Sequence, residues 1–265
     1  MIPKIIHYCW FGGARFSDNE ERCITSWRNN CPDYQIVRWD ETNFNIEENA
    51  YVKQAYLNKK WAFVSDYVRL KVLYDYGGVY MDTDVEVIKT YDSLLEHKLF
   101  CCFEDDNNVS IGTVGAEKGN GFVRELLDSY KNRTFIKSNK EMDMTTNLKI
   151  VTEKLVKDYD LLLDGNLQRL NDGIVIYPKD YFIAKNYKTG EYNITENTYA
   201  IHHYNGSWLS DDDKLYGLLY KRYWNRFSWI RYPKFRHIMA ALSSVLKHRG
   251  IMALMRRVIL KIIKH

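Results

Sequence analysis

The segment from Gly77 to Asp84, Gly-Gly-Val-Tyr-Met-Asp-Thr-Asp, constrains the fold of this chain more than any other. Its apolar residues 79–81 predict a buried strand, and the glycine pair before them ends a helix predicted over residues 60–76. Asp82 and Asp84 follow the strand one residue apart. A buried strand that delivers two carboxylates together is costly unless a cation neutralises them.

This Asp-x-Asp pair predicts a divalent metal site that accepts a diphosphate. Mg²⁺ is typically held by one or two carboxylates plus substrate phosphates, and Mn²⁺ suits the same oxygen ligands. We therefore expect Mn²⁺ or Mg²⁺ at Asp82 and Asp84, where it would stabilise a diphosphate leaving group. The alternative is a solvated turn that follows the strand and binds nothing.

Asp66 and Arg69 lie three residues apart on the predicted helix, so they share one face with Ala62 and Leu73. Their functional interpretation is hydrogen bonding to sugar hydroxyls and to a phosphate, for which the planar fork of arginine is well shaped. The alternative is an exposed ion pair that contributes little to stability.

Aromatic and imidazole side chains lie at two other predicted strand ends. Trp10 precedes Gly12-Gly13 and is a candidate for stacking on a nucleobase, although a buried core tryptophan is the alternative. His202 and His203 end a late strand. A neutral imidazole can complete the shell of a metal, but histidines at such positions also satisfy backbone groups in a core.

Strands alternate with helices along the chain, which predicts an α/β fold with a mainly parallel sheet. Ligands of such sheets bind outside the carboxyl ends of the strands, where Trp10 and the Asp-x-Asp pair are expected. The predicted strands cover residues 5–11, 34–39, 79–82, 99–103, 109–115, 174–177 and 199–203. The predicted helices cover residues 18–30, 47–58, 60–76, 121–131 and 145–158.

Charge is distributed unevenly between the two ends of the chain. Of the 38 basic residues, 13 lie in residues 214–265, where no Asp or Glu occurs, and the remaining 25 face 34 acidic residues. The change in composition near residues 211–213 predicts a catalytic domain over residues 1–210 and a basic, aromatic helical extension over residues 211–265. A basic tail on an acidic body suggests an anionic surface as a partner.

The pattern of the extension is typical of a helix that lies in a membrane interface. Aromatic and basic residues mix over residues 215–235, and apolar residues recur at helical spacing from Ile251 to Ile262. Each basic residue near an anionic leaflet contributes ~1 kcal/mol. A helical cap packed on the acidic body is the alternative. Nucleic-acid binding is not expected, because no recognition motif supports it.

The cysteines and the chain ends predict the compartment. Five cysteines form an odd set without metal-ligand spacing, which favours reduced thiols. No signal peptide precedes Ile2-Pro3-Lys4, and no apolar run approaches the ~20 residues that span a bilayer. We expect a cytoplasmic protein associated peripherally with the inner face of the cell membrane.

Taken together, four stretches resemble glycosyltransferase family 32, the DxD sugar-binding family. They cover residues 2–13, 61–69, 77–84 and 202–208. The family is similar to the glucosyltransferase domains of clostridial toxins and to yeast initiating mannosyltransferases. The resemblance implies a GT-A fold, a Rossmann-like mixed sheet flanked by helices. It also implies retaining transfer from a nucleotide-sugar, and we expect a UDP-sugar. Because the basic extension suggests a membrane, we expect the acceptor to be a lipid-linked oligosaccharide or other glycan of a surface or capsular polysaccharide.

The resemblance also implies roles for individual residues. Trp10 would stack on the base, Asp66 and Arg69 would hold the donor sugar, and Tyr80 would lie close to them. Asp82 would contact the ribose and metal-bound water, and Asp84 would ligate the metal directly.

The histidine segment and its neighbours are less uniform among relatives. The His-Tyr-x-Gly order is similar to the metal-binding segment of the glycogenin-like family, which favours His203 over His202 as a ligand. Ser207 and Trp208 correspond to donor-binding positions, and many relatives have Gly-Pro where this chain has Thr146-Asn147.

The alternatives to glycosyl transfer are a phosphohydrolase and a sugar-binding module. Asp82-Thr-Asp84 is similar to the motif of haloacid-dehalogenase phosphohydrolases, but that pattern requires Thr or Val where Glu86 stands. A non-catalytic, membrane-bound sugar-binding module is the second alternative, and it would bind glycan without metal or nucleotide.

Overall fold

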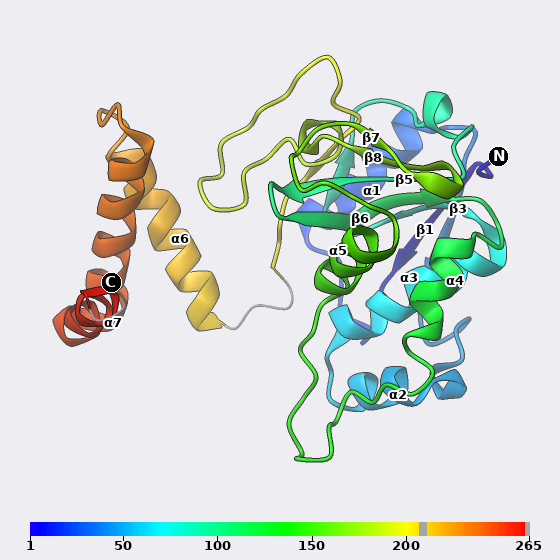
Figure 1. Ribbon diagram of the computed structural model, residues 1–265, viewed down its shortest axis with the longest axis horizontal. Helices are drawn as coiled ribbons and strands as arrows, with labels where there is room; N and C mark the ends of the chain where they lie inside the picture. The colour runs from blue at the N-terminus through cyan, green and yellow to red at the C-terminus, as the bar shows by residue number, and fades with distance from the viewer. Residues whose placement is uncertain (207–210, 263–265) are drawn as a thin grey trace. The chain divides into compact units, whose positions relative to one another are not determined.

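The computed structural model describes residues 1–206 and 211–262, with side chains described for 1–206 and 212–248. The chain forms two compact units (Figure 1). Unit 1 comprises Met1–Ala184 and Asn193–His203, and unit 2 comprises Lys185–Tyr192 and Tyr204–His265. The division into a catalytic domain over 1–210 and an extension over 211–265 stays a prediction.

A seven-stranded mixed sheet forms the centre of unit 1, in the order β2-β1-β3-β6-β5-β8-β7. Its strands are β1 (Ile5–Cys9), β2 (Gln35–Trp39), β3 (Gly78–Met81), β5 (Leu99–Asp105), β6 (Asn108–Ala116), β7 (Gln168–Arg169) and β8 (Ile174–Tyr177). A second sheet pairs β4 (Val85–Val87) with β9 (Ala200–His202). The predicted α/β class, a Rossmann-like mixed sheet flanked by helices, is confirmed.

The expectation of a mainly parallel sheet is wrong. Strands β1–β2, β1–β3 and β5–β8 pair in parallel, whereas β3–β6, β5–β6 and β7–β8 pair antiparallel. Only two residues, Asp106 and Asn107, separate β5 from β6. So short a turn can join antiparallel strands, whereas a parallel pair requires a crossover of a dozen or more residues.

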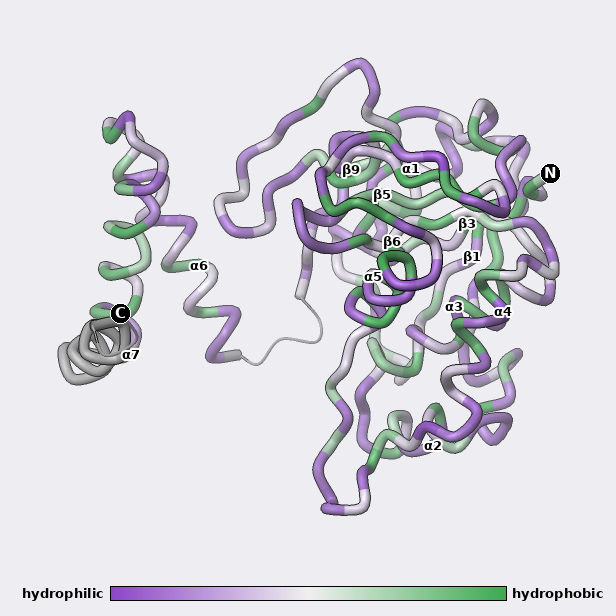
Figure 2. Tube along the Cα trace, viewed as in Figure 1, coloured by the Kyte–Doolittle hydropathy of each residue, from purple (hydrophilic) through white to green (hydrophobic). Residues whose placement is uncertain are grey.

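Helices and aromatic side chains cover both faces of the large sheet. The α-helices are α1 (Asp18–Asn30), α2 (Ala50–Leu57), α3 (Trp61–Tyr76), α4 (Gly121–Asp128) and α5 (Asn147–Asp158). Short 3₁₀ helices lie at η1 (Ile46–Glu48), η2 (Asp92–Leu94), η3 (Asn171–Gly173) and η4 (Lys179–Tyr181). The chain is hydrophobic along β5 and β6, as Figure 2 shows, and β5 is buried on both sides.

Alternate residues of β5 pack into different layers, as the period of two in a strand requires. Leu99 and Cys101 join one large core with α2, α3, α4 and α5. Phe100 packs on the other face against Tyr91 and Phe182, at ring-centroid distances of 6.2 Å and 5.6 Å. The sheet is therefore an inner layer, and packing on both of its faces holds its strands in place.

The connection from α3 to β3 depends on its two glycines. Gly77 and Gly78 have φ values of 68° and 119°, which side-chain-bearing residues rarely adopt. A Cβ at Gly78 would also lie 2.6 Å from the backbone oxygen of Ile5. The prediction that this glycine pair ends the helix is confirmed. The pair also lets the chain turn from α3 into β3.

Unit 2 contains two helices, α6 (Asp211–Arg226) and α7 (Pro233–Ile262), which pack on each other. Their shared core consists of Tyr220, Trp224 and Ala240, with the guanidinium of Arg236 lying 4.0 Å from the centre of the Trp224 ring. Within the described residues, no helix combines the length and the apolar character that crossing a bilayer requires.

All five cysteines of the chain are buried thiols without a disulfide. Burial raises the pKa of both Cys9 and Cys23 to about 12. Because the thiolate is the reactive form, these side chains are inert packing residues, in agreement with the expected reduced thiols.

Candidate active site

Strands β1 and β3 place two predicted site elements at one edge of the sheet. They are neighbours and run parallel, with His7 of β1 opposite Tyr80 of β3. Trp10 follows the end of β1, and Asp82 follows the end of β3. The prediction that both lie at carboxyl ends of strands is confirmed.

Arg69 is the centre of the site. Its Nη2 donates to Oδ1 of Asp82 at 3.0 Å and lies 3.5 Å from Oδ1 of Asp66, while its Nη1 donates to the backbone oxygen of Ile111 at 2.7 Å. The guanidinium also lies 4.6 Å from the centre of the Tyr80 ring. The side chain of Arg69 is 8% exposed, so the alternative of an exposed ion pair on α3 is wrong.

The acids around Arg69 are not fully neutralised by it. Burial raises the pKa of Asp66 to about 6, although the nearby charge of Arg69 opposes that shift. Burial likewise raises the pKa of Asp82, against the charges of Arg69 and His202. Raised carboxyl pKa values mean that ionised Asp66 and Asp82 are destabilised here, and an added cation would relieve this.

The small sheet brings His202 to Asp84. Val85 pairs with His202 across β4 and β9, and Nε2 of His202 lies 3.1 Å from Oδ1 of Asp84. Burial opposes the protonation of His202, but the charge of Asp84, the hydrogen bond to it and the charge of Asp82 together outweigh burial and raise the pKa of His202 to about 9. The imidazole is therefore a direct partner of the second acid of the pair.

His203 faces a different acid. Its Nε2 lies 2.7 Å from Oε2 of Glu86 and 3.4 Å from Nη2 of Arg22. Its backbone N–H donates to the backbone oxygen of Asp84 at 2.8 Å. The preference for His203 as a metal ligand stays a prediction, whereas the geometry favours His202 as the imidazole beside Asp84.

Gly112 of β6 is a site residue that the sequence reasoning missed. The backbone N–H of Asp82 donates to the backbone oxygen of Gly112 at 2.8 Å. A Cβ at Gly112 would lie 2.9 Å from Oδ2 of Asp82 and 3.1 Å from Cε1 of His202. The missing side chain thus lets an acid and an imidazole approach the strand. A glycine inside a strand pattern signals such an approach.

Asn147 stood out in the sequence only as a departure from the Gly-Pro of relatives, and its contact with Asp66 was not predicted. Its backbone N–H, at the start of α5, points to Oδ2 of Asp66 at 3.4 Å, and its Nδ2 donates to the backbone oxygen of Asp66 at 2.6 Å. Tyr130 donates its hydroxyl proton to Oδ1 of Asn147 at 2.6 Å. The start of a helix carries unsatisfied N–H donors and favours a carboxylate, so α5 positions Asp66.

Trp10 is half-buried, so the alternative of a buried core tryptophan is wrong. Its ring packs on Phe16 at a centroid distance of 4.4 Å, and its Nε1 donates to the backbone oxygen of Ala14 at 2.7 Å. Stacking of Trp10 on a base stays a prediction. Ser207 and Trp208 lie outside the described residues.

The donor chemistry of the site fits a hard divalent cation. Oxygens of Asp82 and Asp84 with a nearby imidazole are ligands that Mn²⁺ and Mg²⁺ accept. Within residues 1–206 and 212–248, no three His, Cys, Asp or Glu side chains cluster as a ready-made metal cage.

A family of known proteins is similar to the part of the chain that carries most of this geometry. The family described as "Glycosyltransferase sugar-binding region containing DXD motif" matches residues 17–101, which contain Asp66, Arg69, Asp82 and Asp84. The resemblance to the DxD sugar-binding family is therefore confirmed. The match covers less than half of the chain.

Two curated relatives align with about half of the chain. Inositol phosphoceramide mannosyltransferase 3 of Schizosaccharomyces pombe is 28% identical over 133 residues. Mannosyl phosphorylinositol ceramide synthase SUR1 of Saccharomyces cerevisiae is 28% identical over 138 residues. The alignments cover 48% and 49% of this chain but 36% and 35% of those relatives.

Two solved structures are similar to the chain. One is the PaToxG glycosyltransferase, with a TM-score of 0.48 and 20% identity, covering 59% of this chain and 69% of that protein. The other is a glycosyltransferase involved in the glycosylation of the major capsid of PBCV-1, with a TM-score of 0.44 and 11% identity, covering 78% of this chain and 95% of that protein.

Proposed function

We propose that the chain is a metal-dependent, retaining glycosyltransferase that uses a nucleotide-sugar donor, with a UDP-sugar favoured. The observation that carries this proposal is the buried centre in which Arg69 bridges Asp66 and Asp82, beside the pair of Asp84 and His202. It lies at a carboxyl edge of the sheet, where ligands of α/β proteins bind. The DXD family match, which covers Asp66, Arg69, Asp82 and Asp84 but not His202, supports it.

Each side chain has a distinct task in the proposed reaction. Glycosyl transfer passes through an oxocarbenium-like transition state, as glycoside hydrolysis does. When bound at Asp82 and Asp84, Mn²⁺ or Mg²⁺ supplies Lewis-acid stabilisation of the departing diphosphate. Arg69 adds a fixed positive charge, and preorganised charge is usually the largest catalytic contribution. Asp66, held by Asn147, accepts hydrogen bonds from donor-sugar hydroxyls.

The proposed acceptor is a lipid-linked oligosaccharide or another glycan, as in the synthesis of a surface or capsular polysaccharide. By their names, both curated relatives act on a lipid with a phosphoinositol group. The names therefore favour an acceptor carried on a lipid at a membrane surface.

Unit 2 supports peripheral association with an anionic membrane. Exposed apolar side chains recur along α7 at Phe235, Ile238, Leu242 and Leu246, a spacing that places them on one helical face. Trp229 and other exposed aromatic residues precede them. The apolar residues from 251 to 262 lie outside the described side chains. Loss of binding to anionic liposomes on deletion of residues 214–265 is the expected result, and equal binding would contradict this part of the proposal.

The direct test is transfer from a labelled nucleotide-sugar by variants of the acid pair. We expect Asp84→Ala and Asp82→Ala to lower transfer at least 10²- to 10³-fold, the typical effect of removing one charge-stabilising group, while the protein stays folded. Asp33→Ala removes an exposed acid and is the control. Undiminished transfer by either site variant would contradict the proposed role of the acid pair.

Thermal stability with UDP- and GDP-sugars, with and without Mn²⁺, tests the donor and the metal independently of transfer. A ligand that binds only the folded state must raise the apparent stability. We expect the Mn²⁺-dependent rise to be smaller in His202→Ala than in His203→Ala, because His202 lies beside Asp84. The reverse order would support His203 as the metal ligand.

A further inference from the structure

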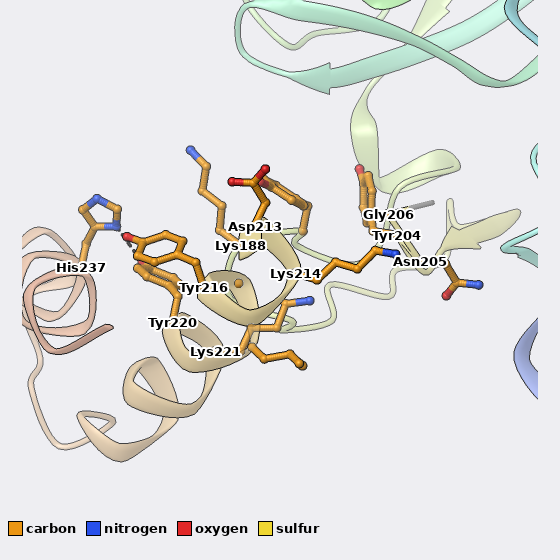
Figure 3. A pocket seen from close by; sticks show the side chains of 13 residues that line it. Lys188, Tyr204, Asn205, Gly206, Asp213, Lys214, Tyr216, Tyr220, Lys221 and His237 are labelled. Carbon is orange, nitrogen blue, oxygen red and sulfur yellow. Dashed lines mark hydrogen bonds between the residues drawn. The ribbon is translucent and has the colours of Figure 1, made fainter. Parts of the chain in front are cut away.

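Unit 2 contains a cavity of about 480 Å³ (Figure 3). Its walls come from the segment 185–192, from residues 204–206 and from α6 and α7, all within unit 2. Its volume lies in the range of about 300–1,000 Å³ typical of small-molecule sites. The cavity is large enough for a sugar ring that carries a phosphate.

Four tyrosines line this cavity. They are Tyr187, Tyr204, Tyr216 and Tyr220. The rings of Tyr187 and Tyr204 lie 5.7 Å apart at 58°, and the hydroxyl of Tyr220 lies 2.6 Å from Nδ1 of His237. Aromatic rings offer a flat apolar face together with a polar edge, so the wall suits a ring whose substituents are hydroxyl groups.

Three lysines also line the cavity, against one acidic residue, Asp213. Lys214 and Lys221 are seven residues apart on α6, so they lie two turns apart on the same side of the helix. Lys188 comes from the segment 185–192, and Figure 3 shows its ammonium group pointing away from those of Lys214 and Lys221. The lining therefore carries an excess of positive charge.

The other described acids of unit 2 are engaged elsewhere. Glu191 accepts from Nε1 of Trp224 at 2.9 Å and lies 3.3 Å from Nη1 of Arg236. Asp212 lies 3.0 Å from Nε2 of His248. After Asp213 the sequence contains no Asp or Glu, so the acids that could balance the lining lysines are few.

The surroundings of Lys221 show the same excess. Burial, and then the charge of Lys185, lowers the pKa of Lys221. An anion near Lys221 would favour its charged form.

We propose that this cavity is a binding site for a phosphorylated sugar or polyol ring. Lys214 and Lys221 hold the phosphate, because lysine binds phosphate as a compact point charge with three donors, and Lys188 adds positive charge to the lining. The tyrosines contact the ring, and Asp213 accepts hydrogen bonds from its hydroxyls. The site uses residues of unit 2 alone, so its occupancy is independent of sugar transfer by unit 1.

Calorimetric titration of the full chain with glucose 1-phosphate tests the site. We expect saturable binding, and binding of glucose or inorganic phosphate at least ~10-fold weaker, because each lacks one half of the recognised group. The same titration of Asp84→Ala, in which unit 2 is unchanged, should give the same affinity. Absence of saturable binding, or loss of binding in Asp84→Ala, would overturn the proposal.

Paired variants separate this site from the general charge of α6. Lys214→Ala combined with Lys221→Ala should weaken glucose 1-phosphate binding ~100-fold, about tenfold for each lost charge-assisted hydrogen bond. Arg222→Ala combined with Arg226→Ala removes the same charge from exposed positions outside the cavity lining, and it should leave binding unchanged. Equal losses in the two double variants would overturn the proposal.

Vesicles distinguish a soluble sugar phosphate from a lipid headgroup as the source of the ligand. Two kinds of phosphatidylcholine vesicle are compared. One contains phosphatidylinositol and the other contains phosphatidylserine, at equal negative charge. A preference for phosphatidylinositol that the lysine double variant abolishes identifies a headgroup ligand. Equal binding to both vesicles, with retained glucose 1-phosphate binding, identifies a soluble ligand. Binding to neither glucose 1-phosphate nor phosphatidylinositol excludes the site.

Discussion

Arg69 on α3 donates to Asp82 at the end of β3 over 3.0 Å, although 13 residues separate them along the chain. The contact forms because Gly77 and Gly78 reverse the chain between the helix and the strand. Both partners are recessed, with side-chain exposures of 8% and 28%. The guanidinium is therefore part of the packed structure as well as of the proposed site.

Arg69→Ala should destabilise the protein by roughly 3–5 kcal/mol, because it leaves buried carboxylates without their cation. Urea denaturation followed by circular dichroism measures this loss. Lys71→Ala removes a more exposed cation of the same helix, whose partners are Asp75 and Glu48, and should cost about 0–1 kcal/mol. Equal costs would mean that the Arg69 network does not contribute to stability as argued.

Gly112→Ala should impair function far more than folding. The new methyl group meets a carboxylate oxygen of Asp82 at 2.9 Å, and a flexible side chain can move away at a cost of about 1 kcal/mol. The displaced Asp82 should lower transfer more than ~10-fold and reduce stabilisation by Mn²⁺ with a nucleotide-sugar.

Gly115→Ala is the contrasting variant on the same strand. Its Cβ would lie 2.2 Å from the Phe100 ring in the core, so we expect overpacking that costs about 1–3 kcal/mol of stability. The folded fraction should retain its affinity for nucleotide. The interpretation of Gly112 would be wrong if both variants lost stability and function in the same proportion.

The stability of the metal-free protein should depend on pH through Asp66. The pKa of this carboxyl is about 6 in the folded protein and about 3.9 when unfolded. The contribution of Asp66 to the free energy of unfolding is therefore fully present below pH ~4 and is lost as the pH rises through 6. The loss occurs because the unfolded chain ionises this acid more readily than the folded protein, in which it is buried.

The comparison with Asp66→Asn isolates this effect. The free energy of unfolding of the natural protein, measured relative to that of Asp66→Asn, should fall by up to roughly 3 kcal/mol between pH 4 and pH 7, at about 1.4 kcal/mol for each pKa unit. Asp33→Asn, at an exposed position, serves as the matched charge control. A flat difference between the natural protein and Asp66→Asn would contradict the burial of this carboxyl.

Asn147 and Tyr130 should be energetically coupled. Asn147→Ala removes the acceptor of the Tyr130 hydroxyl and the donor to the backbone oxygen of Asp66, and unpaired buried groups cost about 1–3 kcal/mol each. A double-mutant cycle with Tyr130→Phe should give a coupling energy of about 0.5–3 kcal/mol. Additive effects would show that the hydrogen bond between them does not support Asp66.

A positioning role for Asn147 has a separate signature. We expect Asn147→Ala to raise the KM for the donor more than it lowers kcat, because Asp66 is proposed to contact the bound sugar. A stability loss with unchanged kinetic constants would assign Asn147 to folding alone.

Local patterns were sufficient to predict much of the fold. The predicted strand over 174–177 matches β8, and the predicted helix over 18–30 matches α1, whose capping box joins Ser17 to Glu20. These elements depend on neighbouring residues, whose apolar periodicity and caps are visible in the sequence. The antiparallel insertion of β6 was missed, because the order of strands in a sheet depends on contacts between distant segments.

The sequence by itself determined that two carboxylates follow a buried strand, with an acid and an arginine on the helix before it. The tertiary structure decided which groups meet them. His202 and His203 are adjacent, and neighbouring residues of an extended chain point to opposite sides. The pairing of β9 with β4 therefore selects His202 for Asp84 and His203 for Glu86. Gly112 and Asn147 lie at the site for the same kind of reason. Strand register places Gly112 there and helix packing places Asn147 there, across distant parts of the chain.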